Sequence, residues 1–421
     1  MTHLQRAKIN ALIRYQAYQK TQQKISEEIY IMYRRLKAVA SRSIYFLCSI
    51  FPIKQKKIVF SAFEGGGYAC NPKYIAEELI RRMHKNNRNY ELIWLVNDLN
   101  KKFPKEIHAV KNDLLNRAYH LSTAKIWIDN ARKNFGTRKR QGQFYMQTWH
   151  GLAIKPVGRM RGRSFSKMAE IVTRYDAKLI DCFLCDSKFA IENFRKSFYN
   201  EPLFKIGLPR CDILVNGIDR QRKIIRQRLN LSQDVKLMLY APTFRGGTQS
   251  QIRDVFQEES TLNFKMLNAA LMKKFGGKWH ILLRLHPQLA LRNNKMNVSN
   301  EFKNFCTDIS FEDDISEYLA AVDSVLTDYS SVVFDAMVMK IPIFIYADDL
   351  DDYIKERGKL IRNIYEYPFP VAKTNEELNN NIINFDEKNY LKKIENFFEI
   401  EEILEDGHAS ERAVDIIEKN L

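Results

Sequence analysis

Short apolar runs alternate with longer amphipathic segments along most of the chain, beginning near residue 57. This alternation is typical of parallel β-strands joined by helices that cover both faces of a sheet. A charged stretch, residues 219–234, separates a first series of such units from a second. The strands expected in the two series are Ile58–Phe63, Glu91–Val96, Ile126–Ile128, Phe144–Thr148, Phe183–Asp186 and Phe204–Ile206, and then Lys236–Ala241, Trp279–Leu285, Ser324–Thr327 and Pro342–Tyr346. The helices expected between them are Pro72–His84, Asp113–Leu121, Lys188–Phe198, Asn263–Phe275, Ser316–Ala321 and Ser330–Met339.

The two series are similar in size, and a chain of 421 residues exceeds the length at which a single core stops growing. We therefore expect an α/β protein with two Rossmann-like domains facing a cleft, over residues 57–215 and 216–421. Residues 1–56 would form a basic helical extension. Ligands of such sheets bind at the carboxyl ends of the strands, so residues that follow a predicted strand are the first candidates for a functional site.

The N-terminal segment combines basic and apolar character. Residues 1–43 have helical spacing with many Lys, Arg and Gln residues, and an apolar, aromatic run follows over residues 44–53. That composition is typical of a helix lying in the plane of an anionic membrane surface, and the alternative is a helix packed on its own protein. The run is shorter than the about 20 residues of a membrane span, and no secretory signal is visible. We expect a peripheral protein on the cytoplasmic face of the cell membrane.

The formal net charge of +17 is concentrated in two segments. Residues 1–57 contain 12 Lys and Arg against 2 Asp and Glu, residues 132–178 contain the same numbers, and the remaining chain is slightly acidic. Aromatic residues such as Trp149 and Tyr175 accompany the second segment, which suggests a nucleic-acid-binding protein as one alternative. No recognised nucleic-acid motif is present, so we expect nucleic acid not to be a partner.

The six cysteines lack the dense spacing of a secreted disulfide framework, which favours a reduced compartment. Cys182 and Cys185 form a C-x-x-C motif inside a predicted buried strand. Residues three apart on a strand point to opposite faces, so core packing is favoured over metal binding. We expect no bound metal and no cofactor.

Small hydroxyl residues follow a predicted strand of the second series, in Thr327–Asp335. Ser330 and Ser331 stand where a helix begins, and free backbone amides at such a point bind anions such as phosphate. Asp335, one turn further, could accept a hydrogen bond from a sugar or polyol hydroxyl. The simpler interpretation is an ordinary helix cap supplied by Asp328 or Ser330.

Two other predicted strands of the second series end in candidate ligand-binding residues. His286 precedes a proline that cannot continue a strand, and its imidazole could donate to a diphosphate or protonate a leaving group. Arg245, in Tyr240–Arg245, offers a planar guanidinium suited to phosphate, and the two glycines after it allow close approach of the backbone. A surface turn is the alternative there.

In the first series, His150 and Gly151 follow a predicted strand within Gln147–Lys155. A neutral imidazole at that place could take the proton of an attacking hydroxyl. The loop Glu64–Gly67, also after a strand, is a further candidate for the lining of the cleft. Four basic residues behind His150 would suit a phosphate-bearing or lipid-linked acceptor: Lys155, Arg159, Arg161 and Arg163.

Taken in order, the segments around His150, Tyr240–Arg245, His286 and Thr327–Asp335 resemble the CDP-glycerol glycerophosphotransferase family. That family contains the primases and polymerases of wall teichoic acid and of related capsular phosphopolymers. The similarity covers roughly residues 57–415, and several ordered motifs are more specific than any one of them. It continues through Lys340–Tyr346, Asp349-Leu350, Tyr353, Arg357-Gly358 and Asp406–Arg412.

The resemblance implies a GT-B-like pair of domains that transfers glycerol phosphate, or a related polyol phosphate, from CDP-glycerol or CDP-ribitol. The acceptor would be a hydroxyl of a lipid-linked saccharide, and CMP would be released. His150 would be the general base and His286 would stabilise the diphosphate. The donor would be held by Thr243, Arg245, Ser330, Ser331 and Asp335. The alternative enzyme is a GT-B glycosyltransferase that uses a nucleotide sugar.

Overall fold

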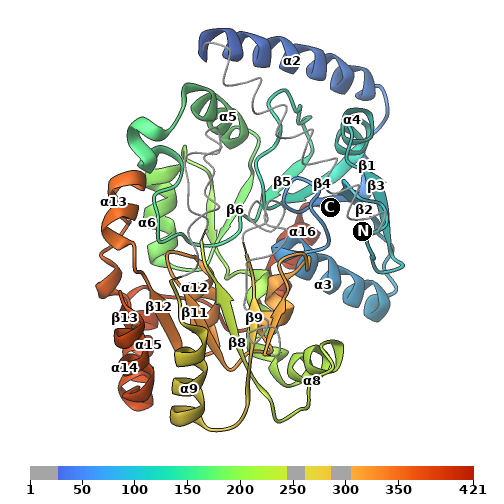
Figure 1. The fold of residues 1–421 in the computed structure, drawn as a ribbon. Helices are drawn as coiled ribbons and strands as arrows, with labels where there is room; N and C mark the ends of the chain where they lie inside the picture. The colour runs from blue at the N-terminus through green and yellow to red at the C-terminus, as the bar shows by residue number, and fades with distance from the viewer. Residues whose placement is uncertain (1–26, 244–260, 286–304) are drawn as a thin grey trace.

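The computed structural model describes residues 27–243, 261–285 and 305–421, and these residues contain two β-sheets whose paired strands are all parallel (Figure 1). The strand order is β3-β2-β1-β4-β5-β6-β7 in the first sheet and β10-β9-β8-β11-β12-β13 in the second. The first sheet consists of β1 (Lys54–Ser61), β2 (Glu91–Val96), β3 (Ile107–Lys111), β4 (Ala124–Asp129), β5 (Phe144–Gln147), β6 (Cys182–Cys185) and β7 (Leu203–Lys205). The second consists of β8 (Lys236–Ala241), β9 (Trp279–Leu283), β10 (Cys306–Asp308), β11 (Ser324–Thr327), β12 (Ile343–Tyr346) and β13 (Val371–Ala372).

The central strands are nearly continuous apolar runs because helices bury both faces of each sheet. In β1, Val59 packs into one apolar layer, whereas Ile58 and Phe60 pack into the layer on the other face. Cys182 and Cys185 are separated in the same way, one thiol in each layer. The two cysteines of the C-x-x-C motif therefore fill the core on opposite sides of β6, as their spacing predicts.

Many of the helices begin at a side chain that accepts a hydrogen bond from the first turn, among them Asp113, Ser187 and Thr374. The helices of the first part of the chain are α2 (Glu27–Cys48), α3 (Cys70–Asn86), α4 (Leu114–Thr123), η1 (Gly158–Ser164), α5 (Lys167–Ala177), α6 (Lys188–Ser197), η2 (Pro209–Cys211) and α7 (Asp212–Asn216). Those of the second part are α8 (Ile218–Arg228), α9 (Phe264–Phe275), α11 (Ile315–Leu319), α12 (Val332–Val338), α13 (Leu350–Arg357), η4 (Ile364–Glu366), α14 (Asn375–Ile383), α15 (Glu387–Ile400) and α16 (Ala409–Lys419).

Each expected strand is present in the structure, with ends shifted by a few residues. The expected boundary between a basic helix and an apolar run near residue 44 is wrong, because α2 continues through Cys48 and residues 44–48 are its last turn. Residues 1–26 of the expected N-terminal helix lie outside the described residues. Among the described residues, no helix has both the length and the apolar character that crossing a bilayer requires.

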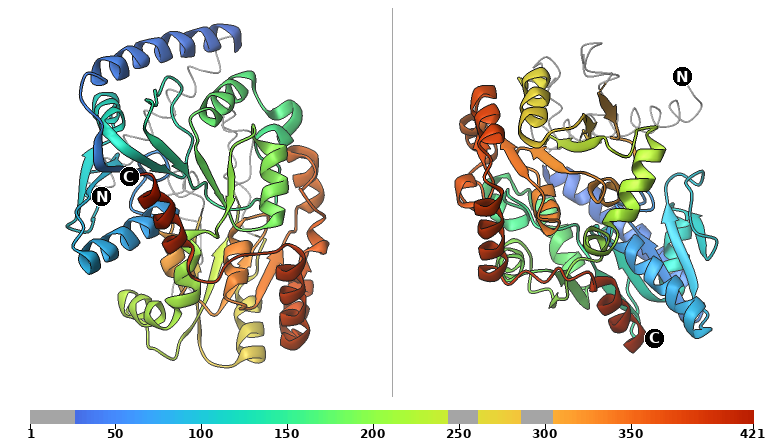
Figure 2. Two further views of the ribbon diagram at one scale, coloured as in Figure 1. Left: turned by 180° about the vertical axis from the view of Figure 1, so that it is seen from behind. Right: turned by 90° about the horizontal axis from the view of Figure 1, so that it is seen from below.

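The last helix, α16, packs beside α3 on the first sheet (Figures 1 and 2). Ala413, Val414 and Ile417 share an apolar layer with β1 and β2. Helix α16 therefore packs on the first sheet although it follows the second sheet in the chain. The expected domain boundaries, at residues 57 and 216, stay predictions.

Candidate functional site

The carboxyl edge of the second sheet brings together segments that are distant in the sequence. Thr243 follows β8, and its backbone N–H donates to both carboxylate oxygens of Asp328, which follows β11, at 2.9 and 3.0 Å. On the other side of β8, the N–H of Arg284 after β9 donates to the Tyr240 carbonyl at 2.9 Å. Three adjacent strands therefore end at one place, and hydrogen bonds fix the turns that follow them.

His286 and Arg245 lie outside the described residues. The described chain stops at Leu285 after β9 and at Thr243 after β8, one and two residues before them. Their assigned roles stay predictions.

Ser330 and Ser331 connect β11 to α12, and both are half-buried. The Ser330 hydroxyl accepts a long hydrogen bond, 3.4 Å, from the N–H of Val332 in the first turn, although the cap position of α12 is Ser331. Within the described part of the chain the Ser331 hydroxyl makes no hydrogen bond with its own helix. This hydroxyl is able to bind a ligand without giving up a bond that the fold needs.

Asp335, one turn into α12, is buried and paired with a residue of the first part of the chain. Its Oδ1 accepts a hydrogen bond from Nη2 of Arg210, in η2, at 2.7 Å. The N–H of Arg210 donates to Asn71 (3.1 Å), and the Asn71 amide donates to the carbonyls of Thr148 and Trp149 (3.2 Å each). The second sheet is thus connected through Asp335 and Arg210 to the turn after β5.

That turn orients His150. Trp149 and Gly151 both have positive φ angles, +50° and +95°, which reverse the chain directly after the strand. The His150 ring stacks on Trp149 with centroids 4.3 Å apart and lies 6.0 Å from Phe63. Its Nδ1 lies 3.0 Å from the carbonyl oxygen of Asn130. Because a carbonyl only accepts, Nδ1 carries the proton and the lone pair of a neutral ring is on Nε2.

The environment keeps His150 neutral. Burial lowers the pKa of His150 to about 4, and the nearby charges of Arg210 and Arg132 act in the same direction, although the bond to the Asn130 carbonyl opposes them. A neutral imidazole with a free Nε2 is the form that can accept a proton from a hydroxyl.

Gly151 lies directly against Arg210. A Cβ atom at this position would overlap the Arg210 guanidinium. Since Arg210 also binds Asp335, the His150 turn and the Ser330–Ser331 turn lie at the same junction between the two sheets. The loop Glu64–Gly67 also contacts the second part, because a Cβ atom at Gly67 would overlap Asp313.

Replacing Gly151 by Ala is expected to destabilise the protein by about 1–3 kcal/mol and to reduce its activity, because the methyl group is strained at positive φ and displaces Arg210. Gly142→Ala is the matched control, since Gly142 has a φ of +85° but nothing within 4 Å of the added atom. Thermal unfolding and turnover of both variants separate backbone strain from the collision. Equal effects of the two substitutions would contradict a special role of the Gly151–Arg210 contact.

The basic residues that follow His150 lie on an exposed segment. The Ile154 carbonyl accepts a hydrogen bond from Ile361 of the second part at 2.9 Å, and Lys155 next to it is exposed. Arg159 and Arg161 are exposed on η1, and the Arg159 guanidinium lies 5.0 Å from the centre of the Tyr199 ring. The backbone of Arg163 belongs to η1, but its side chain is outside the description.

Sequence reasoning missed Arg210, Asn71 and Asn130, which hold the candidate residues in place. Arg210 ends the segment Gly207–Arg210, which follows β7. Its position after a strand could have marked it as a candidate site residue. Asn130 acts through its backbone carbonyl, so its side-chain type carries no signal for this role.

Comparisons with known proteins agree with this fold. The family model described as CDP-Glycerol:Poly(glycerophosphate) glycerophosphotransferase matches residues 43–419. A teichoic acid poly(glycerol phosphate) polymerase of Staphylococcus epidermidis is 33% identical over 385 residues, which are 88% of this chain and 51% of that protein. A teichoic acid glycerol-phosphate transferase of Staphylococcus aureus is 29% identical over 402 residues, 91% of this chain and 99% of that protein. This chain therefore spans about half of the first relative and nearly all of the second.

Among solved structures, a histidine-to-asparagine variant of the wall teichoic acid polymerase TagF soaked with CDPG matches with a TM-score of 0.76. It is 30% identical, and the match covers 93% of this chain and 98% of that one. The family model covers the described elements from the end of α2 to α16. The chain belongs to the CDP-Glycerol:Poly(glycerophosphate) glycerophosphotransferase family.

Proposed function

We propose that the protein transfers glycerol phosphate, or a related polyol phosphate, from a CDP-activated donor to a hydroxyl of a lipid-linked acceptor in teichoic acid or capsular phosphopolymer synthesis. The observation that carries this proposal is the contact of the His150 turn with Arg210, which binds Asp335 one turn beyond Ser330 and Ser331. It brings a neutral imidazole and two small hydroxyl groups to one junction. A GT-B-like arrangement of two domains, with the donor on the second sheet and the acceptor on the first, fits this geometry.

In the proposed reaction, Nε2 of His150 takes the proton of the acceptor hydroxyl, whose oxygen attacks the β-phosphorus of the donor. The new bond joins the acceptor oxygen to that phosphorus, and the bond from the phosphorus to the oxygen bridging the two phosphates breaks. CMP leaves with the electron pair. Hydrogen-bond donors placed around the diphosphate stabilise the charge that develops on it.

The donor would be held at the carboxyl edge of the second sheet. The Ser331 hydroxyl makes no hydrogen bond with α12, and the Ser330 hydroxyl accepts only the long bond from Val332 among the described residues. The hydrogen bond from Thr243 to Asp328 holds Thr243 beside this turn. Oδ1 of Asp335 is engaged by Arg210, so a donor hydroxyl would bind the other carboxylate oxygen, Oδ2. His286 and Arg245 would complete this half of the site from the next residues of the same two turns.

Comparison of donors tests the proposal. CDP-glycerol, CDP-ribitol and a UDP-sugar are each added to the full chain with a lipid-linked saccharide acceptor, and CMP or UDP release and product mass are measured. Release of CMP with a product heavier by one polyol phosphate is expected. Release of UDP with a glycosylated product would instead establish a glycosyltransferase and contradict the proposal.

Ser331→Ala is expected to weaken donor binding by about tenfold, because a hydrogen bond to a charged oxygen contributes about 1.5 kcal/mol or more. Thermal shift against CDP-glycerol concentration measures the change. Ser43→Ala is the control, since Ser43 is exposed on α2 and, among the described residues, its hydroxyl donates to the Val39 carbonyl of its own helix. An unchanged affinity in Ser331→Ala would remove this residue from the donor site.

We further propose that α2 binds the chain to an anionic membrane surface. Its buried residues Ala38, Ser41 and Tyr45 face the protein. On a helical projection the opposite face carries an exposed apolar stripe, flanked by exposed Arg35 and Arg42 on one side and by Lys37 on the other. The stripe and its continuation beyond the helix comprise Ile29, Met32, Tyr33, Leu36, Val39, Phe46, Leu47, Ile50 and Phe51. The η1–α5 segment adjoins the start of this helix, because the N–H of Lys167 donates to Glu27 at 3.1 Å (Figure 1).

Replacing Leu36 and Leu47 together by Glu is expected to abolish sedimentation with vesicles that contain anionic lipid, because two charges enter the face that would lie among the acyl chains. The matched control is Ile400→Glu, at an equally exposed isoleucine on α15. Binding of the double variant equal to that of the unmodified chain would show that another surface contacts the membrane.

A further inference from the structure

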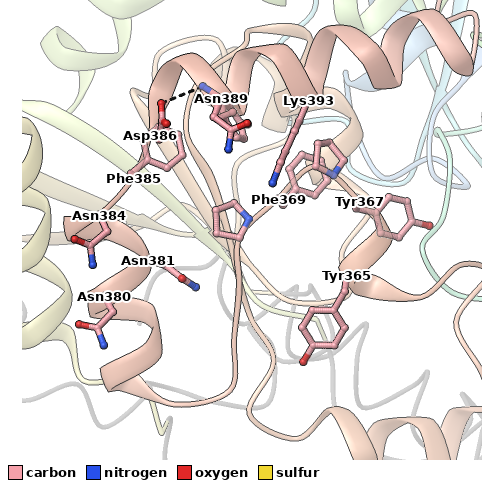
Figure 3. Close-up of a pocket in the computed structure, with 13 residues that line it drawn as sticks. Tyr365, Tyr367, Phe369, Asn380, Asn381, Asn384, Phe385, Asp386, Asn389 and Lys393 are labelled. Atoms are coloured by element: carbon pink, nitrogen blue, oxygen red, sulfur yellow. Dashed lines mark hydrogen bonds between the residues drawn. The ribbon is translucent and has the colours of Figure 1, made fainter.

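A cavity of about 380 Å³ lies in the second part of the chain, among the loop that precedes β13, the end of α14 and the start of α15 (Figure 3). Its walls are rigid, because Phe369, Phe385 and Tyr390 are each at most 5% exposed, and the last two pack with ring centroids 5.0 Å apart. The Asn381 amide donates to the Val371 carbonyl at 3.0 Å and fixes the end of α14 to the start of β13. The cavity is therefore preformed, which lowers the entropic cost of binding.

The cavity is separate from the candidate site. In a parallel sheet all strands run in one direction, so the loop before β13 lies at the amino edge, whereas Thr243 and Ser330 follow strands at the carboxyl edge. Helix α14 returns from β13 towards the amino edge, and α15 starts there. A ligand in this cavity would not occupy the donor site.

Side chains with unused hydrogen-bonding capacity surround the cavity. No hydrogen bond or ion pair joins the side chains of Asn380, Asn384, Asn389 or Lys393 to any other described residue, although all four are exposed at its rim. Each amide offers an acceptor and two donors. The ring of Tyr365 is 56% exposed and adds a flat apolar face. Figure 3 shows that these side chains come from three segments: the loop that precedes β13, the end of α14 and the start of α15.

This chemistry selects a hydroxyl-rich ligand. Planar amides pair with neighbouring hydroxyl groups, and an aromatic ring packs against the C–H face of a sugar or polyol. The lining contains one cation, Lys393, and one carboxylate, Asp386, which also caps α15. Recognition would therefore come mainly from the hydroxyl groups of the ligand, and Lys393 could bind one phosphate if the ligand carries any.

We propose that this cavity is a second binding site, for a saccharide or a polyol-phosphate chain, at the edge of the second sheet opposite the donor site. Both ligands would be recognised through their hydroxyl groups. The polyol-phosphate chain carries phosphate and the saccharide does not, and Lys393 is the cation of the cavity lining that could bind this phosphate. The site does not depend on the transfer reaction proposed above.

Isothermal titration of the full chain with a synthetic glycerol phosphate tetramer, and separately with a neutral disaccharide, tests this inference. At least one probe is expected to bind, and Tyr365→Ala and Asn389→Ala are each expected to weaken that binding tenfold or more. If the tetramer is the ligand, Lys393→Ala weakens its binding as well; if the disaccharide is, Lys393→Ala has little effect. Lys392→Ala is the matched control, because Lys392 is exposed on the same helix but does not line the cavity.

The absence of binding by both probes, or equal binding by the unmodified chain and the two cavity variants, would overturn the inference. Binding within the donor site would not respond to Tyr365→Ala, so the variants identify the location. All substituted residues are exposed, and thermal unfolding checks that each variant is folded. Turnover of CDP-glycerol on a short acceptor is expected to persist in Tyr365→Ala, which separates this proposal from that of the transfer reaction.

Discussion

His150→Ala is expected to lower the rate of polyol-phosphate transfer by about 10²- to 10⁴-fold, the usual contribution of a positioned general base. The reason is local: the Asn130 carbonyl holds the proton on Nδ1, and Nε2 is the only remaining base on the ring. Release of CMP under saturating donor and acceptor measures the loss. His150→Gln retains a side-chain donor for the Asn130 carbonyl but no comparable base, so it should be as slow as His150→Ala.

Another histidine serves as the control for this prediction, and one outcome would contradict it. His84, which is 61% exposed on α3 and pairs with Glu106, is replaced by Ala as the matched control and should leave the rate unchanged. If His150→Gln keeps most of the activity, the imidazole is a structural group and not the base.

The pH dependence follows from the same environment. Burial lowers the pKa of His150 to about 4, below the usual value near 6.5, so the free protein has the neutral base at all pH values above about 5. kcat/KM, which reports the free enzyme, should therefore stay level between pH 8 and pH 6 and fall only as pH approaches 4. A histidine with an ordinary pKa would instead lose about half of this quantity at pH 6.5.

Strands and helices could be predicted wherever burial imposes a regular pattern. Strands β1, β2 and β8 are continuous apolar runs between helices and were expected within a few residues. The edge strand β7 was expected, but three other edge strands were missed: β3, which contains His108 and Lys111, β10, which has three residues, and β13, which has two. Their pairing is set by the neighbouring strand and not by their own pattern. Helix α16 packs on the first sheet although it follows the second, and an amphipathic segment alone does not specify which apolar surface it covers.

The candidate site could likewise be predicted only in part from the sequence. The positions of Ser331 and His150, in the turns after β11 and β5, could be predicted because a parallel sheet gathers such turns at its carboxyl edge, and their roles stay predictions. The contact between Arg210 and Asp335 could not be predicted, because it joins residues 125 positions apart and depends on how the two sheets meet. The position of Asp335 suggested a bond to a sugar or polyol hydroxyl, and the family resemblance implied a role in holding the donor. That role stays a prediction alongside its contact with Arg210.

The second large effect is expected from Arg210→Met, which leaves the Asp335 carboxylate buried without its partner. The two side chains are 7% and 8% exposed, and removing one member of such a buried pair costs about 3–5 kcal/mol. The substitution also removes the guanidinium that connects the His150 turn to α12, so activity should fall together with stability. Urea unfolding followed by circular dichroism, with turnover on the same samples, measures both. Lys355→Ala, at an exposed ion pair with Asp352, should change neither.

The double variant Arg210→Met with Asp335→Leu separates the two consequences of losing Arg210. Two apolar side chains can replace a buried ion pair with little loss of stability, so the double variant should regain much of the unfolding free energy that Arg210→Met loses. Its activity should stay low, because Asp335 would no longer be present to bind the donor and the His150 turn would still lack its polar contact. Recovery of both stability and activity would mean that the pair is only a structural connection and that Asp335 has no part in donor binding. Recovery of neither would mean that the guanidinium itself, through its contact with Gly151, holds the junction together.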